Sequence, residues 1–280
     1  MKRPIIGRYF SSDILPTIKS DFGFLVKKII RSGFEYDLQI RDGYFNLYYR
    51  GNSLGKVSYK KLTERYTVEI HEKFVSKNER LREEFEHRPG EYFSFTVPRG
   101  EIHRFFRSEH LRKMGTRVRE VNYQEETTFE QMLITDNVGR SDVIIIDRQI
   151  ADRAHTTKMD LLALVRKEKD DYQFCIIEVK LGNNPELRGD VNDQLEGYKK
   201  RISDNLDDYR KCYEINFRQK QELGLLREDL NINIVPGVLG VVIVGGYSGI
   251  AEKSIEELKK THPDLKVLHL KNSIDLSKVI

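Results

Sequence analysis

Apolar positions in the N-terminal part of the chain follow first a helical and then a strand-like period. The second half of residues 13–33 has apolar positions at helical spacing, and the pattern predicts that this helix ends at Gly33. Three short runs with strand-like alternation follow, at residues 36–41, 44–49 and 54–59. The turns between them contain Asp42-Gly43 and Gly51-Asn52. Because Asp-Gly between two such runs is a strong hairpin signal, the sequence predicts a three-stranded antiparallel meander.

The remainder of the N-terminal part completes a small α+β module. Residues 63–75 fit either a strand or a helix, and residues 81–100 are broken at Pro89-Gly90 and at Pro98. We predict that this module covers residues 1–118 and binds nucleic acid or a protein partner.

The pattern changes from residue 119, and residues 119–280 are predicted to form a second, α/β module. An amphipathic helix is expected first, because Phe129, Met132 and Leu133 recur at helical spacing. The elements expected after it are strands at 141–150, 159–167 and 172–180, helices at 190–206 and 216–230, a strand at 238–246, a helix at 252–262 and a strand at 265–271. The short polar connector at 168–172 favours a hairpin between the second and third strands. This order predicts an α/β fold built on a mixed sheet flanked by helices.

Composition narrows the class of protein. The 280 residues allow one large or two modest domains, and the chain is 39% hydrophobic and 33% charged. No stretch has the roughly 18 uninterrupted apolar residues of a membrane helix, and the first residues have no apolar run typical of a secretory signal. Two cysteines are too few for a disulfide scaffold or a structural zinc site. We therefore expect a cytoplasmic protein that does not bind membranes.

The charge is mildly basic and unevenly distributed. A net charge of +4 and a pI near 8.8 permit nucleic-acid binding without requiring it. Residues 99–119 contain six arginines, one lysine and only two acids, together with Phe105 and Phe106. Basic side chains interleaved with aromatic rings suit phosphate contacts and base stacking. A solvated connector whose two phenylalanines pack into a core explains the segment equally well.

The predicted strand at 172–180 carries the most informative chemistry. Since side chains alternate along a strand, Glu178 and Lys180 project to the same side at its end. An ionised carboxylate next to a core is costly unless it is paired or binds a metal. Asp160 begins the neighbouring strand, so a hairpin would bring it next to this pair. Two carboxylates and an amine at one end of a sheet suit Mg²⁺ or Mn²⁺.

A downstream helix adds a second signal, since Gln194 and Tyr198 lie one turn apart on one face. Each feature alone has an ordinary explanation. Glu-x-Lys is frequent in a chain so rich in charge, and a glutamine above a half-buried tyrosine is common on helices. Their order along the chain, with an aspartate at the matching strand end, favours a functional site.

These residues resemble the PD-(D/E)XK nuclease superfamily, and the Gln194–Tyr198 pair resembles the Q-x-x-x-Y motif of its RecB-like branch. The resemblance covers roughly residues 120–250 and implies a restriction-endonuclease-like fold. It implies that Asp160 and Glu178 bind the metal together with the main-chain carbonyl of Val179. It further implies that Lys180 orients or activates the attacking water, and that Gln194 and Tyr198 lie near the metal and the substrate backbone.

In this family a further acid usually comes from the first helix of the domain, and the resemblance makes Glu126 and Glu130 the candidates here. The sequence does not choose between them, and solvation on the surface explains either one alone.

The function that we expect is metal-dependent hydrolysis of phosphodiester bonds in nucleic acid, with DNA favoured over RNA. A homodimer is one possible state. The alternative is a nucleic-acid-binding protein or complex subunit that retains the nuclease fold without cutting. A small-molecule enzyme that uses the glycine turn near residue 245 is disfavoured, because the turn matches no nucleotide-binding fingerprint.

Overall fold

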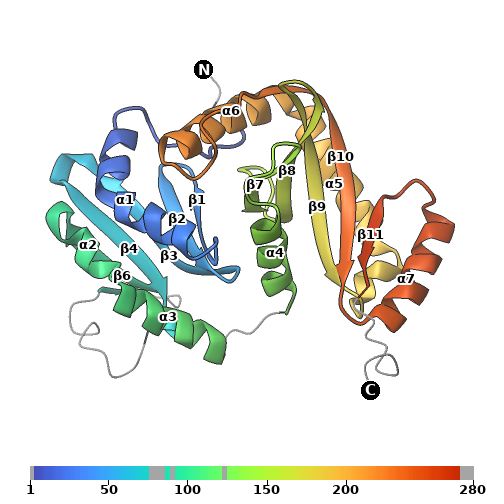
Figure 1. Ribbon diagram of the computed structural model, residues 1–280, viewed down its shortest axis with the longest axis horizontal. Helices are drawn as coiled ribbons and strands as arrows, with labels where there is room; N and C mark the ends of the chain where they lie inside the picture. Colours follow the sequence, from blue (N-terminus) through green and yellow to red (C-terminus); the bar gives the residue numbers. More distant parts are fainter. Residues whose placement is uncertain (1–2, 76–85, 89–91, 122–124, 272–280) are drawn as a thin grey trace. The chain divides into compact units, whose positions relative to one another are not determined.

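The computed structural model describes the backbone of residues 3–75, 86–88, 92–121 and 125–271, and the side chains of all of these except residues 86–88. The protein has an α/β fold with two separate sheets. Its internal contacts divide the chain into two compact units (Figure 1). The first unit comprises Met1–Gly139 and Lys211–Leu230, and the second comprises Arg140–Arg210 and Asn231–Ile280. The division into modules at 1–118 and 119–280, which was expected from the sequence, remains a prediction.

The sheet of the first unit is antiparallel throughout, with the strand order β1-β2-β3-β4-β6-β5. Its strands are β1 (Tyr36–Ile40), β2 (Tyr44–Tyr49), β3 (Asn52–Lys60), β4 (Arg65–His71), β5 (Glu86–Arg88) and β6 (Tyr92–Pro98). The predicted meander is therefore confirmed as β1, β2 and β3. The segment at 63–75, which fitted a strand or a helix, contains strand β4. The predicted break at Pro89-Gly90 lies outside the described residues.

Three helices belong to this sheet: α1 (Leu15–Arg31), α2 (Ile102–Phe105) and α3 (Ser108–Val121). The predicted end of α1 at Gly33 has a clear backbone cause. Gly33 adopts φ of +62°, a left-handed conformation that glycine adopts without steric cost. The N–H groups of Gly33 and Phe34 donate to the carbonyls of Ile30 and Ile29, which closes the last turn of the helix.

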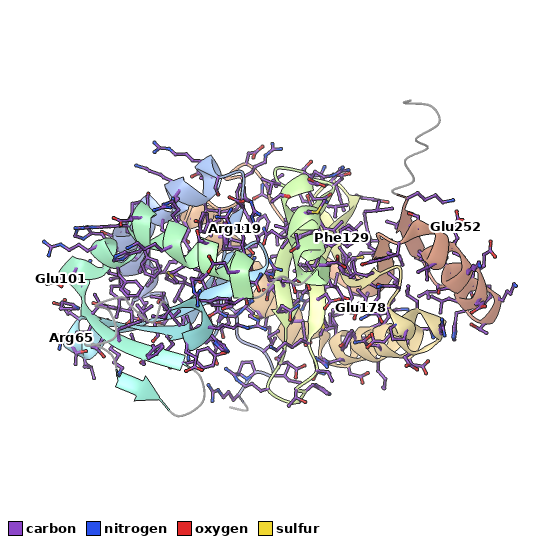
Figure 2. All side chains as sticks on the ribbon, turned by 90° about the horizontal axis from the view of Figure 1, so that it is seen from below. Arg65, Glu101, Arg119, Phe129, Glu178 and Glu252 are labelled. Atoms are coloured by element: carbon purple, nitrogen blue, oxygen red, sulfur yellow. The ribbon has the colours of Figure 1, made fainter. Side chains whose placement is uncertain are left out.

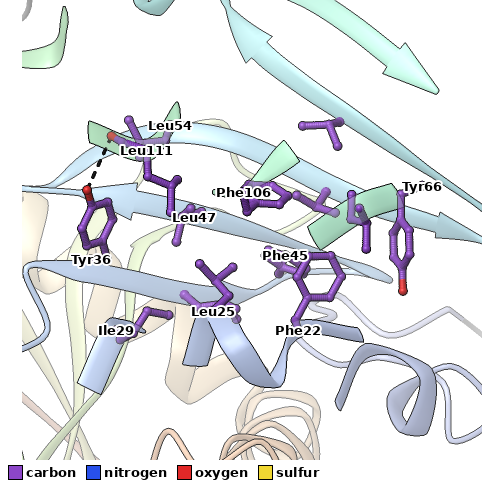
Figure 3. Packing of buried hydrophobic residues seen from close by; sticks show 14 of the residues in the cluster. Phe22, Leu25, Ile29, Tyr36, Phe45, Leu47, Leu54, Tyr66, Phe106 and Leu111 are labelled. Atoms are coloured by element: carbon purple, nitrogen blue, oxygen red, sulfur yellow. Dashed lines mark hydrogen bonds between the residues drawn. The ribbon is translucent and has the colours of Figure 1, made fainter. Parts of the chain in front are cut away.

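The core of the first unit joins these helices to one face of the sheet (Figure 3). The Phe22 ring of α1 packs against Phe45 of β2 at a centroid distance of 4.9 Å and against Phe106 at 5.9 Å. Phe106 is buried and Phe105 packs on the same cluster. The base-stacking interpretation of these two phenylalanines is therefore wrong, and the alternative, that they fill a core, is confirmed.

The second unit contains a mixed five-stranded sheet with the order β11-β10-β9-β8-β7. Its strands are β7 (Val143–Ile150), β8 (Met159–Glu168), β9 (Asp171–Leu181), β10 (Asn233–Gly245) and β11 (Val267–Leu270). The first three pair antiparallel in sequence order, and the hairpin between β8 and β9 is the one that the short connector at 168–172 predicted. Strand β10 is parallel to both β9 and β11, and a parallel neighbour requires a long crossover.

The remaining helices are α4 (Glu125–Asp136), α5 (Asp190–Asp204), α6 (Leu206–Glu222) and α7 (Ser248–Thr261). The helix predicted at 216–230 begins earlier, at Leu206, and ends at Glu222. Strand β10 also begins earlier than expected, because Pro236 and Gly237 form a bulge inside it rather than preceding it. Proline cannot donate to a strand ladder, so such a bulge is a position where a strand tolerates it. No helix in the described part of the chain has the length and apolar character needed to cross a membrane.

Helix α5 covers the face of the second sheet that carries Glu178 and Lys180. Gly240 of β10 pairs with Ile176 of β9, so the two residues point to the same side of the parallel pair. A Cβ atom added at Gly240 would lie 2.9 Å from the Leu195 side chain of α5. The face of Ile176 is also the face of Glu178, and this close approach of helix to sheet places α5 beside that carboxylate.

Candidate active site

The pairing of β8 with β9 places Asp160 against the end of the neighbouring strand. Leu161 pairs with Ile177, so the next position of the antiparallel register sets Asp160 opposite Glu178. The Oδ2 atom of Asp160 accepts a hydrogen bond of 2.9 Å from the main-chain N–H of Val179. The proximity predicted from the hairpin is thus present in the structure.

Lys180 lies between two carboxylates. Its Nζ atom is 2.9 Å from Oε1 of Glu178 and 2.7 Å from Oε2 of Glu186. Glu178, labelled in Figure 2, is only 1% exposed and Lys180 is 5% exposed. Glu186 belongs to a short 3-10 turn, Pro185–Arg188, and its side chain is 44% exposed. Removing both charged groups of such a buried ion pair from water is costly. Their attraction offsets this cost only if the geometry is good and further hydrogen bonds are made to both groups.

Burial and the neighbouring charges together set the pKa values of the site. Removal from water raises the pKa of Asp160, although the Val179 N–H and the Lys180 charge act in the opposite direction. Burial lowers the pKa of the Lys180 ammonium, but the carboxylates of Glu178 and Glu186 outweigh it and hold that pKa above its ordinary value. Lys180 is therefore a fixed positive charge at neutral pH.

The donor set fits a hard divalent cation. Asp160 lies opposite Glu178 across the β8–β9 pair, so the two carboxyl groups are cross-strand neighbours. Two ionised carboxylates at that separation repel each other, and a cation between them removes the repulsion. Among the described residues no three His, Cys, Asp or Glu side chains converge in the manner of a complete metal cage. Mg²⁺ needs no such cage, since it binds through one or two carboxylates and completes its shell with waters and substrate phosphates.

The predicted additional acids lie on α4, which belongs to the first unit. Glu130 is buried, at 3% exposure, whereas the sequence favoured solvation for each of these glutamates taken alone. Glu126 is intermediate in exposure. Membership of either residue in the metal site, like that of the Val179 carbonyl, stays a prediction.

Gln194 and Tyr198 are joined to each other and to the segment that leads into β8. The Gln194 amide donates to the Tyr198 hydroxyl at 3.1 Å, and that hydroxyl donates to the Lys158 carbonyl at 2.8 Å. Burial raises the pKa of Tyr198, and the charges of Glu178 and Asp160 raise it further, as expected for a neighbour of the carboxylates. In this arrangement Tyr198 holds the backbone two residues before Asp160.

Two residues of the site escaped the sequence reasoning. Arg201, one turn beyond Tyr198, is buried and donates to the Thr157 carbonyl at 3.2 Å and to its hydroxyl at 2.7 Å. Glu186 pairs with Lys180. The spacing of Arg201 from Tyr198 was the one available signal, since residues three apart share a helix face. Nothing in the sequence around Glu186 distinguishes it from a surface acid.

The glycine turn after β10 is a tight connection from strand to helix. Strand β10 ends at Gly245 and α7 begins at Ser248, with Gly246 and Tyr247 both at positive φ. Gly182, two residues after Lys180, packs so closely against this turn that an added Cβ would collide with the Gly246 carbonyl. The turn thus supports the end of β9 that carries Lys180.

Comparison with known proteins adds no assignment: no protein-family model, curated protein or solved structure matches this chain.

Proposed function

We propose that this protein is a metal-dependent nuclease that hydrolyses phosphodiester bonds in nucleic acid, with DNA favoured over RNA. The observation that carries the proposal is the convergence of Asp160, Glu178 and Lys180 at one end of the β8–β9 hairpin. The succession of a helix, three antiparallel strands, helices and a parallel strand supports a restriction-endonuclease-like fold. DNA repair, restriction or defence against mobile elements are the settings that the family resemblance implies. We also propose a cytoplasmic location, since the chain has only two cysteines, too few for a disulfide scaffold.

Asp160 and Glu178 would hold Mg²⁺ or Mn²⁺. Such an ion, when bound, polarises the scissile phosphate and lowers the pKa of a bound water. Asp160 is oriented for this role by the Val179 N–H, and Glu178 by Lys180. The fixed orientation of both carboxylates removes a reorganisation cost from the reaction.

Lys180 acts as a positive charge and hydrogen-bond donor. An ammonium has three N–H donors, and the two carboxylates that contact Lys180 engage two of them. The third would serve a phosphate oxygen or the attacking water. Because its pKa lies above the ordinary value, Lys180 stabilises negative charge that develops on the phosphate rather than removing a proton.

The test is cleavage of single- and double-stranded DNA and RNA by the full chain with Mg²⁺, Mn²⁺ or EDTA. We expect metal-dependent cutting that EDTA abolishes and that Lys180→Ala reduces by about 100-fold or more, the typical effect of removing one such donor. Lys200→Ala is the matched control, because Lys200 lies on the exposed side of α5, where it forms an ion pair with the exposed Asp204. Circular dichroism verifies that both variants are folded.

Two results would reject the proposal: wild-type protein that cuts no nucleic acid with either metal, or Lys180→Ala protein that cuts as fast as wild type. Binding of nucleic acid without any cutting would instead favour the non-catalytic alternative.

A further inference from the structure

Helices α1, α2 and α3, with the 3-10 turn Arg99–Glu101 that precedes α2, cover one face of the first sheet. Phe22 of α1 contacts Phe45 of β2. A Cβ atom added at Gly115 of α3 would lie 2.9 Å from the Tyr49 ring, also on β2. Phe45 and Tyr49 are four residues apart on one strand and so share a face. We refer to residues 15–31 and 99–121 as the helical layer.

The helical layer holds more positive charge than the whole chain. Its sequence contains eleven Lys or Arg residues and four Asp or Glu residues, a net charge of +7. The complete chain has a net charge of +4, so all other residues together sum to −3. The mildly basic character of the protein therefore comes from this layer.

Three of the four acids in the layer are already used in ion pairs within it. Asp21 pairs with Arg99, Glu109 with Lys113 and Glu120 with Arg117. The fourth, Glu101, is exposed (Figure 2). Besides the three basic residues in these ion pairs, the layer contains eight others: Lys19, Lys27, Lys28, Arg31, Arg104, Arg107, Arg112 and Arg119. Seven of the eight are exposed and Lys28 is partly buried, so the excess charge faces solvent.

The aromatic residues of the segment do not accompany this charge to the surface. Phe106 is buried, and Phe105 packs on Phe95 of β6 with its ring centroid 5.1 Å away. Without exposed rings at these positions, the charged surface has no stacking platform for bases there. Its chemistry is that of long cationic side chains, which bind phosphate groups independently of sequence.

The positions along α3 suit a regularly spaced polyanion. Arg112 and Arg119 are two helical turns apart on one side of α3, a separation of about 10 Å along its axis. Phosphates follow one another along each strand of a duplex at a rise of about 3.4 Å, so the two arginines match sites about three nucleotides apart.

From these observations we propose that the helical layer is the surface that binds the phosphate backbone of nucleic acid. The choice of nucleic acid among polyanions rests on the proposed nuclease function, whereas the location of the surface rests on its charge. Binding here is independent of base sequence and is tightest at low salt. It would hold the substrate on the protein while the candidate active site acts.

The experiment measures binding in EDTA, where no cutting interferes. Full-length protein is titrated onto labelled duplex and single-stranded DNA of about 30 nucleotides at several salt concentrations. The variant Arg104→Gln/Arg107→Gln/Arg112→Gln removes three exposed charges for which no side-chain hydrogen bond or ion pair is found in the described structure. If all three contact phosphates, the slope of log K against log salt becomes shallower by about 2.7 on duplex and by about 2.1 on single strands.

The matched control is Lys253→Gln/Lys259→Gln/Lys260→Gln, which removes three exposed charges from α7 in the second unit. It lowers the net charge equally and is expected to leave the salt slope unchanged. The inference is overturned by equal weakening in the two triple variants, by wild-type affinity in the arginine variant, or by wild-type protein that binds anionic lipid vesicles but no nucleic acid.

The two proposals can fail separately. Loss of binding in the arginine variant supports the helical layer even if the wild type cuts nothing with metal. Metal-dependent cutting with unaltered binding in the arginine variant supports the nuclease and rejects the layer.

Discussion

Tyr198 links the candidate site to the chain segment that leads into it. Its hydroxyl donates to the Lys158 carbonyl and accepts from Gln194. The family resemblance implies that Gln194 and Tyr198 act near the substrate backbone. The hydrogen bonds indicate two different roles. Tyr198 positions the start of β8, and Gln194 orients the Tyr198 hydroxyl.

Replacement of Tyr198 by phenylalanine tests whether its hydroxyl positions the start of β8. The change removes the donor to the Lys158 carbonyl and leaves that carbonyl without this hydrogen bond, so we expect a loss of about 1–2 kcal/mol in the free energy of unfolding. Urea denaturation measures the loss. We also expect the Mg²⁺ concentration for half-maximal cutting to rise, because Asp160 is less firmly held.

Gln194→Ala is the comparison for this variant. It leaves the Tyr198–Lys158 bond intact and is expected to lose less stability and less activity than Tyr198→Phe. A Gln194→Ala protein with wild-type stability and a larger loss of activity would instead show that the amide contacts the substrate directly.

At the scale of single residues, the alternation of side chains along a strand predicted more of the site than the Glu-x-Lys motif does alone. Glu178 and Lys180 had to share a side because they are two apart on a strand. Glu186 could not be identified, since its role depends on a short turn folding back toward Lys180. A local pattern contains no information about such a contact.

At the scale of elements, the packing of α5 on β10 positions Gln194 and Tyr198 over the sheet. The contact is possible because Gly240 lacks a side chain, which lets Leu195 approach closely. An apolar run predicted β10, and within that run the buried residues are those at its end, from Val242 to Gly245. The periodicity of 190–206 likewise predicted α5 but not the point at which it meets the strand.

Gly240→Ala is therefore expected to destabilise the protein. The added methyl group would lie 2.9 Å from the Cγ and Cδ2 atoms of Leu195, which is buried. Overpacking of this kind costs about 1–3 kcal/mol in the free energy of unfolding.

Gly197→Ala on α5 is the control for that substitution. Apart from its chain neighbours and the nearby backbone of α5, no atom of the described residues would lie within 4 Å of a methyl group added there. It replaces a helical glycine without a clash and is expected to add about 0.5–1 kcal/mol to stability. Chemical denaturation compares the two variants, and equal effects of the same sign would contradict the packing argument.

At the scale of the whole molecule, the chain is interleaved between its two units. Residues 211–230 belong with the N-terminal part, between two segments that belong to the second unit. In the first unit, the Gln219 amide of α6 donates to the Phe10 carbonyl and accepts from the Phe10 N–H, each at 2.8 Å. Residues 209 positions apart are thereby joined, a contact that no sequence period predicts.

Metal binding should stabilise the folded chain as a whole, because Asp160 and Glu178 converge only when β8 and β9 pair. A ligand at ten times its Kd adds about 1.4 kcal/mol, which corresponds to roughly 2–4 °C in Tm for a chain of this size class. We expect about 10 mM MgCl2 to raise the Tm of wild type if the Kd is about 1 mM. Differential scanning calorimetry of wild type and Asp160→Asn/Glu178→Gln provides the measurement, and an equal rise in both proteins would reject a metal site at these carboxylates.

The sequence by itself predicted the meander β1–β3, helix α1 and the order of the elements from α4 to β11, and that Glu178 and Lys180 lie on the same side of their strand. These properties follow from periods of two and 3.6 residues, which are local to each segment. The sequence left β4 undecided and did not predict strand β6 or helix α3. Only the tertiary structure decided that residues 211–230 join the first unit, that Phe105 and Phe106 join a core, and that the positive charge gathers on the helical layer. Each of these depends on contacts between segments distant in sequence, where a pattern specifies which face is buried but not which partner buries it.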